Sequence, residues 1–503
     1  MRRASSFVIA VSALLGVCAS SCDAASDGST EQRSAAPKAL VLEPCRIADP
    51  IGTSAITAEC GTLRVPEDPA RPDGRQIGLF VARVPAISRR KQPDPLFVIA
   101  GGPGMASSEF FASVAPAFAR IQRNRDIVLV DQRGTGRSNA LNCGLVDEAL
   151  WQAHEEVIAA EAERCLTALG TRADVKFYTT SIAVQDLERV RTAFGYERIN
   201  LYGVSYGTRV AQHFVRRFPD RVRSMILDGV VPPEVALGPD LALHAEAALE
   251  RILARCERAP ECRERFGDPQ RIYRELRAQL AEEPIEVVLP DPTTGEMRRL
   301  EFTELHLAAA LRLATYSADQ ASLLPLSLYM AQHDHDFVPL AAQFLLTSRS
   351  LEEQLAYGMH NAVVCTEDVP FFEVTDEDRA RLAQTYLGTA AVDMLLTVCG
   401  SWPRGMMDPD LHAPLVSDVP ALLLSGGDDP VTPPLYAEQA MKGLSNAVHV
   451  SLAGMGHGQV VAPCVDRVMA QFLEQAAPKK LDISCTQRVT PPPFFTSLAG
   501  PAP

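Results

Sequence analysis

The chain has 503 residues, of which 47% are hydrophobic and 22% are charged, so it can form at least one large core. Its net charge of −14 argues against nucleic acid and anionic membrane surfaces as partners, because both carry the same sign of charge. The composition is that of an acidic globular protein.

The first 22 residues have the pattern of an export signal. Two arginines precede an apolar stretch from Phe7 to Val17, which is too short to span a bilayer as a helix. The following segment resembles a bacterial lipoprotein cleavage site, with Ala19 in place of the usual leucine. Acylation of Cys22 and simple cleavage nearby both stay open. We expect a bacterial protein that is periplasmic, anchored by a lipid or secreted.

The other cysteines predict disulfide bonds. Cys18 and Cys22 fall in the signal region, which leaves ten of the twelve. An even number in an exported chain favours disulfides, and the absence of any Cys-x-x-Cys disfavours zinc. The sequence does not fix the connectivity, but pairing between neighbours requires the least rearrangement. The expected pairs are Cys45 with Cys60, Cys143 with Cys165, Cys256 with Cys262, Cys365 with Cys399, and Cys464 with Cys485.

From about residue 60 the chain alternates strand-like and helix-like segments. Two initial strands, Gly61–Val65 and Ile77–Val84, are joined by a turn region rich in Pro, Asp and Gly. Further short β-rich runs follow at Leu96–Ala100, Ile127–Val130, Ile199–Tyr202 and Ser224–Leu227. Helical segments separate most of them. This alternation predicts a mostly parallel sheet with helices on both faces.

Near Pro232 the pattern changes. The chain becomes largely helical, and strand character returns only at Ala421–Leu424 and Val448–Leu452. One α/β core with a helical insertion over the strand ends explains this order. The expected parts are a signal peptide at 1–22, a flexible leader at 23–40, core at 41–233 and 411–488, a helical cap at 234–410, and an extended or disordered proline-rich tail at 489–503.

The pentapeptide Gly203-Val-Ser-Tyr-Gly207 stands between a predicted strand and a predicted helix. A serine at such a turn is held in a strained conformation with its hydroxyl exposed at the sheet edge. The two glycines remove Cβ atoms where strand and helix approach closely. The sequence therefore predicts Ser205 as a nucleophile. The pentapeptide also occurs by chance, so the prediction depends on the residues that accompany it.

A glycine-rich loop, Gly101-Gly-Pro-Gly104, follows the predicted strand at Leu96–Ala100. Acyl transfer requires backbone N–H groups directed at the oxyanion that develops on the substrate. In α/β hydrolases one donor belongs to the residue after the nucleophile and the other to the loop after the third strand. Tyr206 and Gly102 are therefore the expected oxyanion-hole donors.

Asp429 and His457 each follow a predicted strand, so both are expected at the same sheet edge as Ser205. The order Ser, Asp, His along the chain is the order that this architecture uses. We expect His457 to accept the serine proton and later to protonate the leaving group. Asp429 is expected to hold the imidazole tautomer and to stabilise the imidazolium.

Two other acids compete for this role. Asp428 adjoins Asp429, but the frame Asp-Pro-Val-Thr-Pro favours the second of the pair. Asp228 ends a predicted strand and is a candidate acid in a variant geometry.

Other histidines carry no expected chemistry. His449 lies within a strand and is expected to be packed or solvated, and His333 and His335 point in different directions on a helix. We therefore expect no metal. We also expect no cofactor, because no Gly-x-Gly-x-x-Gly stands at the first strand–helix turn.

Together these segments resemble the proline iminopeptidase and tripeptidyl aminopeptidase branch of the α/β-hydrolase superfamily, especially its secreted members. The resemblance covers about residues 45 to 488. It is carried by Gly101–Gly104, Asp131–Ser138, Gly203–Gly207, Leu227–Pro233, Cys365–Asp368, Asp429–Pro433, Gly456–Gly458 and Cys464–Cys485. It implies a serine exopeptidase that releases residues or short peptides from free N-termini. Many relatives place a histidine before the glycine-rich loop, where this chain has Ala100.

An aminopeptidase also needs an anion that binds the substrate ammonium. Glu367 and Asp368 near the end of the insertion are candidates, as is Glu109 beyond the glycine-rich loop. Carboxylates at such positions more often have a structural role than a role in binding substrate. Asp131 and Arg133 are expected to brace the active-site loops.

Two further functions stay open. A carboxylesterase or lipase would use the same triad without any change of role. A binding protein that keeps the fold but lacks activity is disfavoured, because nucleophile, acid, base and glycine-rich loop are all present. We expect peptides as substrates, no nucleic-acid partner, and contact with a membrane only through a lipid at Cys22.

Overall fold

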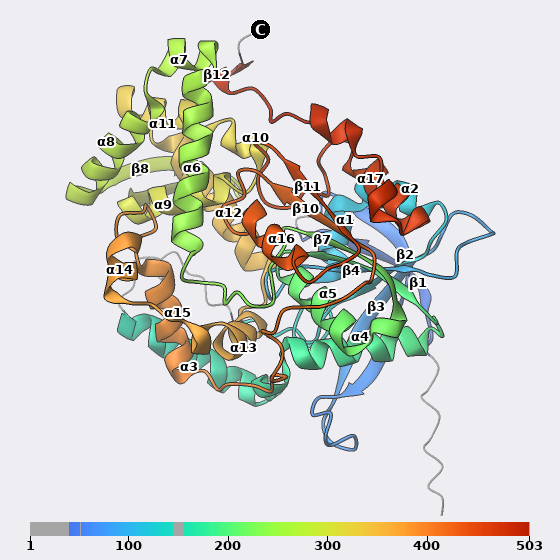
Figure 1. Ribbon diagram of the computed structural model, residues 1–503. Helices are drawn as coiled ribbons and strands as arrows, with labels where there is room; N and C mark the ends of the chain where they lie inside the picture. The colour runs from blue at the N-terminus through green and yellow to red at the C-terminus, as the bar shows by residue number, and fades with distance from the viewer. Residues whose placement is uncertain (1–39, 51, 144–154, 502–503) are drawn as a thin grey trace, which may run out of the picture. The chain divides into compact units, whose positions relative to one another are not determined.

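The computed structural model describes residues 40–50, 52–143 and 155–501 (Figure 1). The expected signal peptide, including Cys22, lies outside the described residues, as does nearly all of the expected leader. In the part of the chain that is described, no helix is long and apolar enough to cross a membrane.

A nine-stranded sheet has the order β1-β2-β3-β5-β4-β6-β7-β10-β11. The pairs from β1 to β5 are antiparallel, and every pair from β5 to β11 is parallel. The strands are β1 (Glu43–Ala48), β2 (Ala55–Pro66), β3 (Gln76–Val84), β4 (Leu96–Ile99), β5 (Ile127–Val130), β6 (Ile199–Val204), β7 (Val222–Asp228), β10 (Ala421–Gly426) and β11 (Ala447–Leu452). The predicted α/β fold is therefore confirmed.

The central strands are continuous apolar runs because both faces of the sheet are covered. Alternate side chains enter opposite cores: Phe97 and Ile99 of β4 lie in one cluster, and Leu96 and Val98 lie in the other. One face is covered by α1 (Ser107–Val114), α2 (Ala119–Gln122) and α17 (Val465–Gln475). The other is covered by α3 (Glu155–Gly170), α4 (Thr180–Ala193), α5 (Tyr206–Arg217) and α16 (Pro434–Met441).

Between β7 and β10 the chain forms an insertion with a hydrophobic core of its own (Figure 1). Its helices are α6 (Leu241–Arg258), α7 (Pro260–Phe266), α8 (Pro269–Glu282), α9 (Glu304–Ala314), α10 (Ala318–Ala321), α11 (Leu324–His333), α12 (Val338–Gln354), α13 (Tyr357–Glu367), α14 (Asp376–Leu382) and α15 (Ala390–Ser401).

The insertion also contains an antiparallel hairpin that the sequence analysis did not anticipate. It consists of β8 (Ile285–Pro290) and β9 (Met297–Phe302). Val287 and Leu289 are buried while their neighbours are exposed, which is the alternation of a half-buried strand. Asp291 accepts the N–H groups of Thr293 and Thr294 and so fixes the turn.

The described part of the tail is extended and packs on the insertion. Phe494 is buried in the core of the insertion, and the Phe495 N–H donates to the Ser322 carbonyl at 3.0 Å. A short pair, β12 (Phe495–Ser497) and β13 (Gly500–Pro501), follows. Two successive phenylalanines supply apolar surface that outweighs the proline-rich composition.

Five disulfide bonds occur in the described part of the chain, and they join the expected neighbours. The bond between Cys365 and Cys399 connects α13 to α15 and closes a sequence separation of 34 residues. The bond between Cys256 and Cys262 closes a separation of only 6.

Removal of the long-range bond is expected to destabilise the protein more than removal of the short one. A double Cys365→Ser, Cys399→Ser variant is expected to lose about 2–4 kcal/mol of unfolding free energy in urea. A matched Cys256→Ser, Cys262→Ser variant is expected to lose about 1.5 kcal/mol less, because it closes a shorter loop in the unfolded chain. Equal losses would show that native-state packing, not loop closure, determines the effect.

Candidate active site

Ser205 lies in a sharp turn between β6 and α5. Its backbone has φ 55° and ψ −126°, a combination that residues other than glycine rarely adopt. A Cβ on Gly203 would lie 2.3 Å from the Gly207 carbonyl oxygen, and a Cβ on Gly207 would lie 2.4 Å from that of Ile99. The two glycines therefore allow α5 to approach the sheet and force the turn. Ser205 is the only residue from 201 to 210 that is not buried.

The glycine-rich loop contacts this turn. A Cβ on Gly101 would lie 2.9 Å from the Ser205 Cβ, so only glycine fits there. Gly102 has φ +104° and is exposed to solvent. Tyr206 is the first residue of α5, where N–H groups have no acceptor within the helix. The backbone thus brings two polar segments next to one accessible hydroxyl.

Asp429 and His457 lie in the loops after β10 and β11. His457 Nδ1 is 2.8 Å from Asp429 Oδ2. The other carboxylate oxygen accepts the N–H groups of Val431 and Thr432, each at 2.8 Å, and the Thr432 hydroxyl donates to Oδ2 at 2.9 Å. These bonds hold a fully buried carboxylate in one orientation toward the imidazole. The sequence pointed to Thr432 only as part of the Asp-Pro-Val-Thr-Pro frame.

Two residues from other segments hold the imidazole in place. The backbone N–H of His457 donates to the Tyr316 carbonyl of the insertion at 2.8 Å, and the two rings meet edge to face with their centroids 5.3 Å apart. A Cβ on Gly229, the residue after β7, would lie 3.0 Å from His457 Cε1. No local pattern in the sequence distinguishes Tyr316, because its partner is distant along the chain.

The electrostatics of the pair favour an ion pair over two neutral groups. Burial by itself would lower the pKa of His457, but the Asp429 carboxylate and, more weakly, Asp228 raise it above the ordinary 6.5. Burial would raise the pKa of Asp429, but His457 and the N–H donors hold it below its usual range. The pair can therefore stabilise an imidazolium as it forms.

Asp228, the alternative acid, has a different set of partners. Its carboxylate accepts the Gln459 N–H at 2.7 Å and the Tyr202 hydroxyl at 2.8 Å. Burial raises its pKa to about 6. Asp228 thus fixes the loop that carries His457, whereas Asp429 bonds to the imidazole itself.

The comparisons with known proteins agree with this geometry. Residues 94–266 match a family model described as the alpha/beta hydrolase fold, and residues 384–485 match one described as TAP-like protein. The chain is 30% identical over 507 positions to Carboxylesterase B of Mycobacterium tuberculosis, with 90% of this chain and 92% of that protein covered. The chain belongs to the α/β-hydrolase family.

Two other relatives of this α/β hydrolase are named as peptidases. Serine protease Hip1 of Mycobacterium tuberculosis is 27% identical over 466 positions, covering 86% of this chain and 88% of that protein. Tripeptidyl aminopeptidase of Streptomyces coelicolor is 26% identical over 471 positions, covering 86% and 84%. These alignments and the TAP-like match agree with the branch that the sequence motifs indicated.

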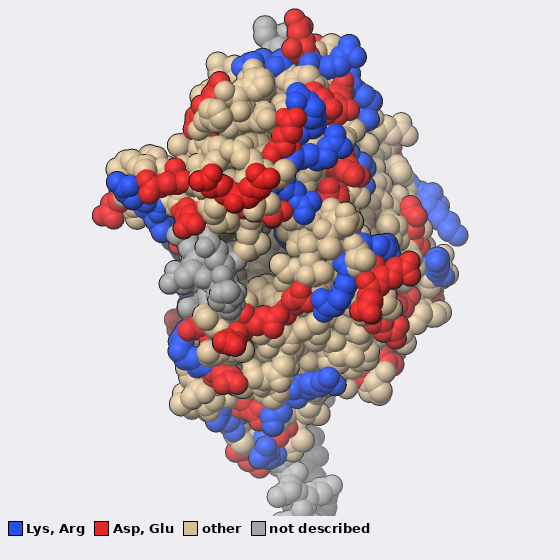
Figure 2. Space-filling view, turned by 90° about the vertical axis from the view of Figure 1, so that its left-hand side faces the viewer, with Lys and Arg blue, Asp and Glu red and all other residues tan. Residues whose placement is uncertain are grey.

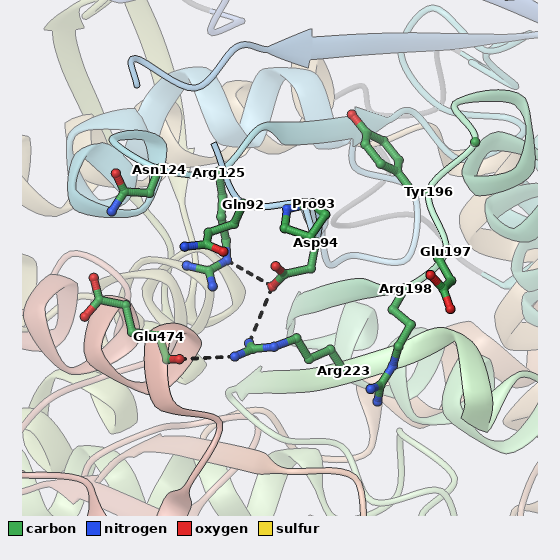
Figure 3. A pocket seen from close by; sticks show the side chains of 11 residues that line it. Gln92, Pro93, Asp94, Asn124, Arg125, Tyr196, Glu197, Arg198, Arg223 and Glu474 are labelled. Carbon is green, nitrogen blue, oxygen red and sulfur yellow. Dashed lines mark hydrogen bonds and ion pairs between the residues drawn. The ribbon is translucent and has the colours of Figure 1, made fainter. Parts of the chain in front are cut away.

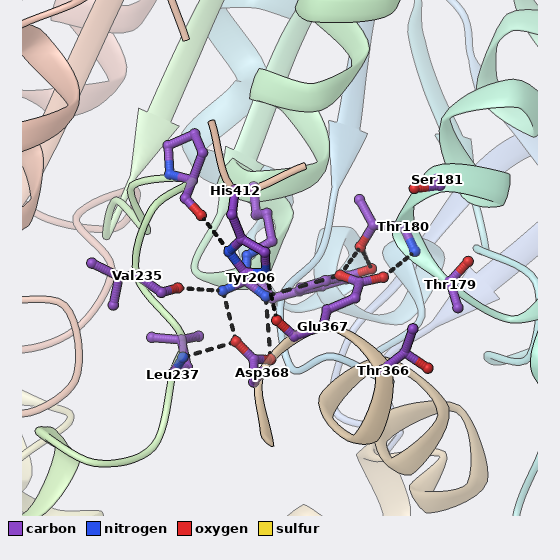
Figure 4. Close-up of polar contacts among 12 residues, drawn as sticks. Thr179, Thr180, Ser181, Tyr206, Val235, Leu237, Thr366, Glu367, Asp368 and His412 are labelled. Atoms are coloured by element: carbon purple, nitrogen blue, oxygen red, sulfur yellow. Dashed lines mark hydrogen bonds and ion pairs between the residues drawn. The ribbon is translucent and has the colours of Figure 1, made fainter. Parts of the chain in front are cut away.

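Glu367 does not reach the surface of the hydrolase. It is fully buried, and its two carboxylate oxygens accept the N–H and the hydroxyl of Thr180, each at 2.7 Å (Figure 4). Asp368 is equally buried and forms a bidentate pair with Arg209 of α5 at 2.8 and 3.2 Å. This placement contradicts the prediction that either carboxylate binds a substrate amine, because protein groups already occupy both.

Glu109 lies in the first turn of α1, directly beyond the glycine-rich loop, and is half-buried. Burial and the nearby Asp131 carboxylate raise its pKa to about 7. Within the described ranges no cation forms an ion pair with it. Of the three candidate anions, Glu109 is the one that is not fully buried.

Asp131 and Arg133 brace the loops, as expected. Asp131 accepts the N–H groups of Ser108 and Arg137 at 2.9 and 3.1 Å, which ties the start of α1 to the loop after β5. Arg133 is fully buried and forms a bidentate pair with Asp186. Neither side chain is free to take part in chemistry.

A cleft of about 650 Å³ lies at the opposite edge of the sheet, where the parallel strands begin (Figure 3). Its central carboxylate, Asp94, pairs with Arg125 at 3.1 Å and with Arg223 at 3.5 Å. Arg223 also donates to the carbonyls of Leu473 and Glu474. These charges satisfy one another and connect β4, β5 and β7 to α17, and the described residues that line the cleft include no serine, cysteine or histidine.

The pH dependence of turnover is expected to follow His457. A base must be neutral, so kcat/KM rises with pH through a pKa that lies above 6.5. Asp429→Asn removes the negative charge, so the acid limb of the profile is expected to shift to lower pH. We also expect kcat to fall about ten-thousand-fold. Asp228→Asn is expected to shift the limb in the same direction by less. An unmoved limb in Asp429→Asn would contradict the ion pair.

Proposed function

We propose that this protein is an exported serine aminopeptidase that releases residues or short peptides from free N-termini through an acyl-enzyme on Ser205. The observation that carries the proposal is the strained Ser205 turn, in contact with the glycine-rich loop and at the same sheet edge as the Asp429–His457 pair. These are the parts that acyl transfer requires.

In the proposed reaction His457 accepts the Ser205 hydroxyl proton while Oγ bonds to the substrate carbonyl carbon. The carbonyl π electrons move to oxygen, and the N–H groups of Gly102 and Tyr206 stabilise the resulting oxyanion. Collapse of this intermediate breaks the C–N bond, and His457 returns the proton to the leaving amine. A water molecule then attacks the acyl-enzyme by the same steps, with His457 as the base, and the N-terminal fragment is released from Ser205.

Two observations support peptides with a free amine as substrates. The relatives named tripeptidyl aminopeptidase and serine protease align over most of both chains. Glu109, which forms no ion pair among the described residues, lies in the first turn of α1 directly beyond the glycine-rich loop, which is expected to bind the carbonyl oxygen of the acyl group. Since the acyl group of an aminopeptidase carries the substrate ammonium, this is the side where an anion is needed.

The charge distribution also favours cationic substrates. Figure 2 shows bands of Asp and Glu side chains across one face of the molecule, with Lys and Arg side chains among and around them. With a net charge of −14, such a surface attracts an ammonium group before it reaches the site. Export is supported by the disulfide bonds, which persist mainly in oxidising compartments.

The second candidate function is a carboxylesterase, which the relative named Carboxylesterase B favours. A panel of chromogenic substrates separates the two functions. An aminopeptidase is expected to cleave free-amine peptide amides and to reject the same peptides with a blocked N-terminus. Comparable cleavage of both forms, with faster turnover of short acyl esters, would favour the esterase.

Replacement of the nucleophile is expected to abolish turnover. Ser205→Ala should lower kcat about a millionfold, because the serine and histidine act as a unit. The matched control is Ser445→Ala, since Ser445 is exposed in the loop before β11. Full activity in the purified Ser205→Ala protein would overturn the assignment.

Removal of the charge at Glu109 is expected to affect only substrates with an ammonium group. Glu109→Gln should lower kcat/KM for a free-amine peptide amide about 10- to 100-fold, which is the value of one hydrogen bond to a charged group. Turnover of an uncharged ester should stay within about twofold. Glu377→Gln, an exposed glutamate also in a first helical turn, serves as control. Equal loss on both substrates would assign Glu109 a structural role.

A further inference from the structure

The glycine-rich loop receives a hydrogen bond from the insertion. His360 of α13 places Nδ1 3.1 Å from the Pro103 carbonyl oxygen. A carbonyl oxygen only accepts hydrogen bonds, so the proton of the neutral ring resides on Nδ1. Burial lowers the pKa of His360, which keeps the imidazole neutral. The residue before the loop is Ala100, whose side chain can give no such support.

The segment that leads into α13 contacts the same loop. The Ala356 N–H donates to the Gly104 carbonyl at 3.0 Å, and Leu355 forms an isolated antiparallel bridge with Met105. A Cβ on Gly102 would lie 3.1 Å from the Leu355 side chain. Residues 355–360 thus hold the loop that carries one expected oxyanion donor.

The other end of α13 is connected to the side chain of Tyr206, the residue whose backbone N–H is the second expected donor. Tyr206 OH lies 2.7 Å from the Thr180 hydroxyl, which in turn donates to Glu367, the last residue of α13 (Figure 4). Asp368 then pairs with Arg209, one turn further along α5. The disulfide bond at Cys365 attaches this end of α13 to α15. The start of α5 is therefore held by the same helix that holds the glycine-rich loop.

We propose that α13 sets the spacing of the oxyanion hole, with His360 and Glu367 as positioning residues for its two halves. They stand seven positions apart in the helix, a rigid span of about 10 Å. Two N–H donors on different loops must converge on one oxygen, and a misplacement of about 1 Å costs about a hundredfold in rate. A single helix that bonds to the glycine-rich loop at one end and, through Thr180, to Tyr206 at the other fixes the separation of the two donors.

This inference rests on the acyl-transfer chemistry of the proposed function and not on its peptide specificity. The test therefore uses an uncharged p-nitrophenyl ester as substrate and a trifluoromethyl ketone as the mimic of the oxyanion. A fluorophosphonate titrates the fraction of active sites, so that kcat is expressed per competent molecule.

The critical comparison is between His360→Leu and His360→Asn. Leucine fills a similar space without a donor, whereas asparagine places an amide N–H where imidazole has Nδ1–H. His360→Leu is expected to lower kcat and the affinity for the ketone by the same factor, about 10- to 100-fold, with KM nearly unchanged. His360→Asn is expected to recover most of both quantities. His449→Leu is the control, because His449 of β11 bonds to Ser425 of β10 at 3.0 Å and does not contact the glycine-rich loop or α13.

Tyr206→Phe tests the opposite end of the helix. It removes the hydroxyl that connects α5 to Thr180 but keeps the backbone N–H. We expect a smaller loss of kcat and of ketone affinity, about 3- to 10-fold, and non-additivity in the double variant with His360→Leu, because both act through one helix. Strict additivity would show that the two ends work independently and would overturn the inference.

The outcomes separate the two levels of the proposal. If His360→Leu keeps full kcat per titrated site and binds the ketone normally, the inference about α13 is wrong even though the enzyme is a serine hydrolase. If His360→Leu only lowers the titrated fraction and the melting temperature, His360 is merely structural. If the wild type hydrolyses the ester but no free-amine peptide, the aminopeptidase assignment fails while the α13 result stands.

Discussion

The close packing of α5 on β4 and β6 is the constraint on which the site depends. The backbone of Gly207 lies against that of Ile99 with no room for a Cβ, so the chain must turn sharply at Ser205. A positive φ at a residue other than glycine costs about 1–3 kcal/mol, and the surrounding buried core offsets it. As a result, the Ser205 hydroxyl is accessible at the end of an otherwise buried strand. The other loops of the site are arranged around that hydroxyl.

Buried carboxylates at strand ends hold these loops in place. Asp131 after β5 and Asp228 at the end of β7 accept backbone N–H groups from another segment, and Asp429 after β10 accepts those of its own loop. Ionised groups tolerate burial only when such donors surround them. The same carboxyl chemistry therefore serves two purposes at one sheet edge. Two of these acids position backbone, and Asp429 also orients the imidazole.

The sequence predicted features that local patterns encode. Strand runs, the turn at Ser205, the order of Asp429 and His457 and the neighbouring cysteine pairs all depend on short spacing or on chain order. The role of Glu367 was not predictable in this way, because it depends on contacts with Thr180 and Arg209, far away in the chain. His360 carries no local signal for the same reason. The β8–β9 hairpin was missed because its short alternation is masked by the helices that flank it.

The tail contact of Phe494 has a consequence for how substrates enter. Besides its two chain connections and the contacts of α13, the insertion is held by the segment after α17, which returns to pack on it. Any swing of the whole insertion away from the sheet would have to expose this phenylalanine, at a cost of about 1.5–3 kcal/mol. Access by tilting the insertion as one body is therefore disfavoured.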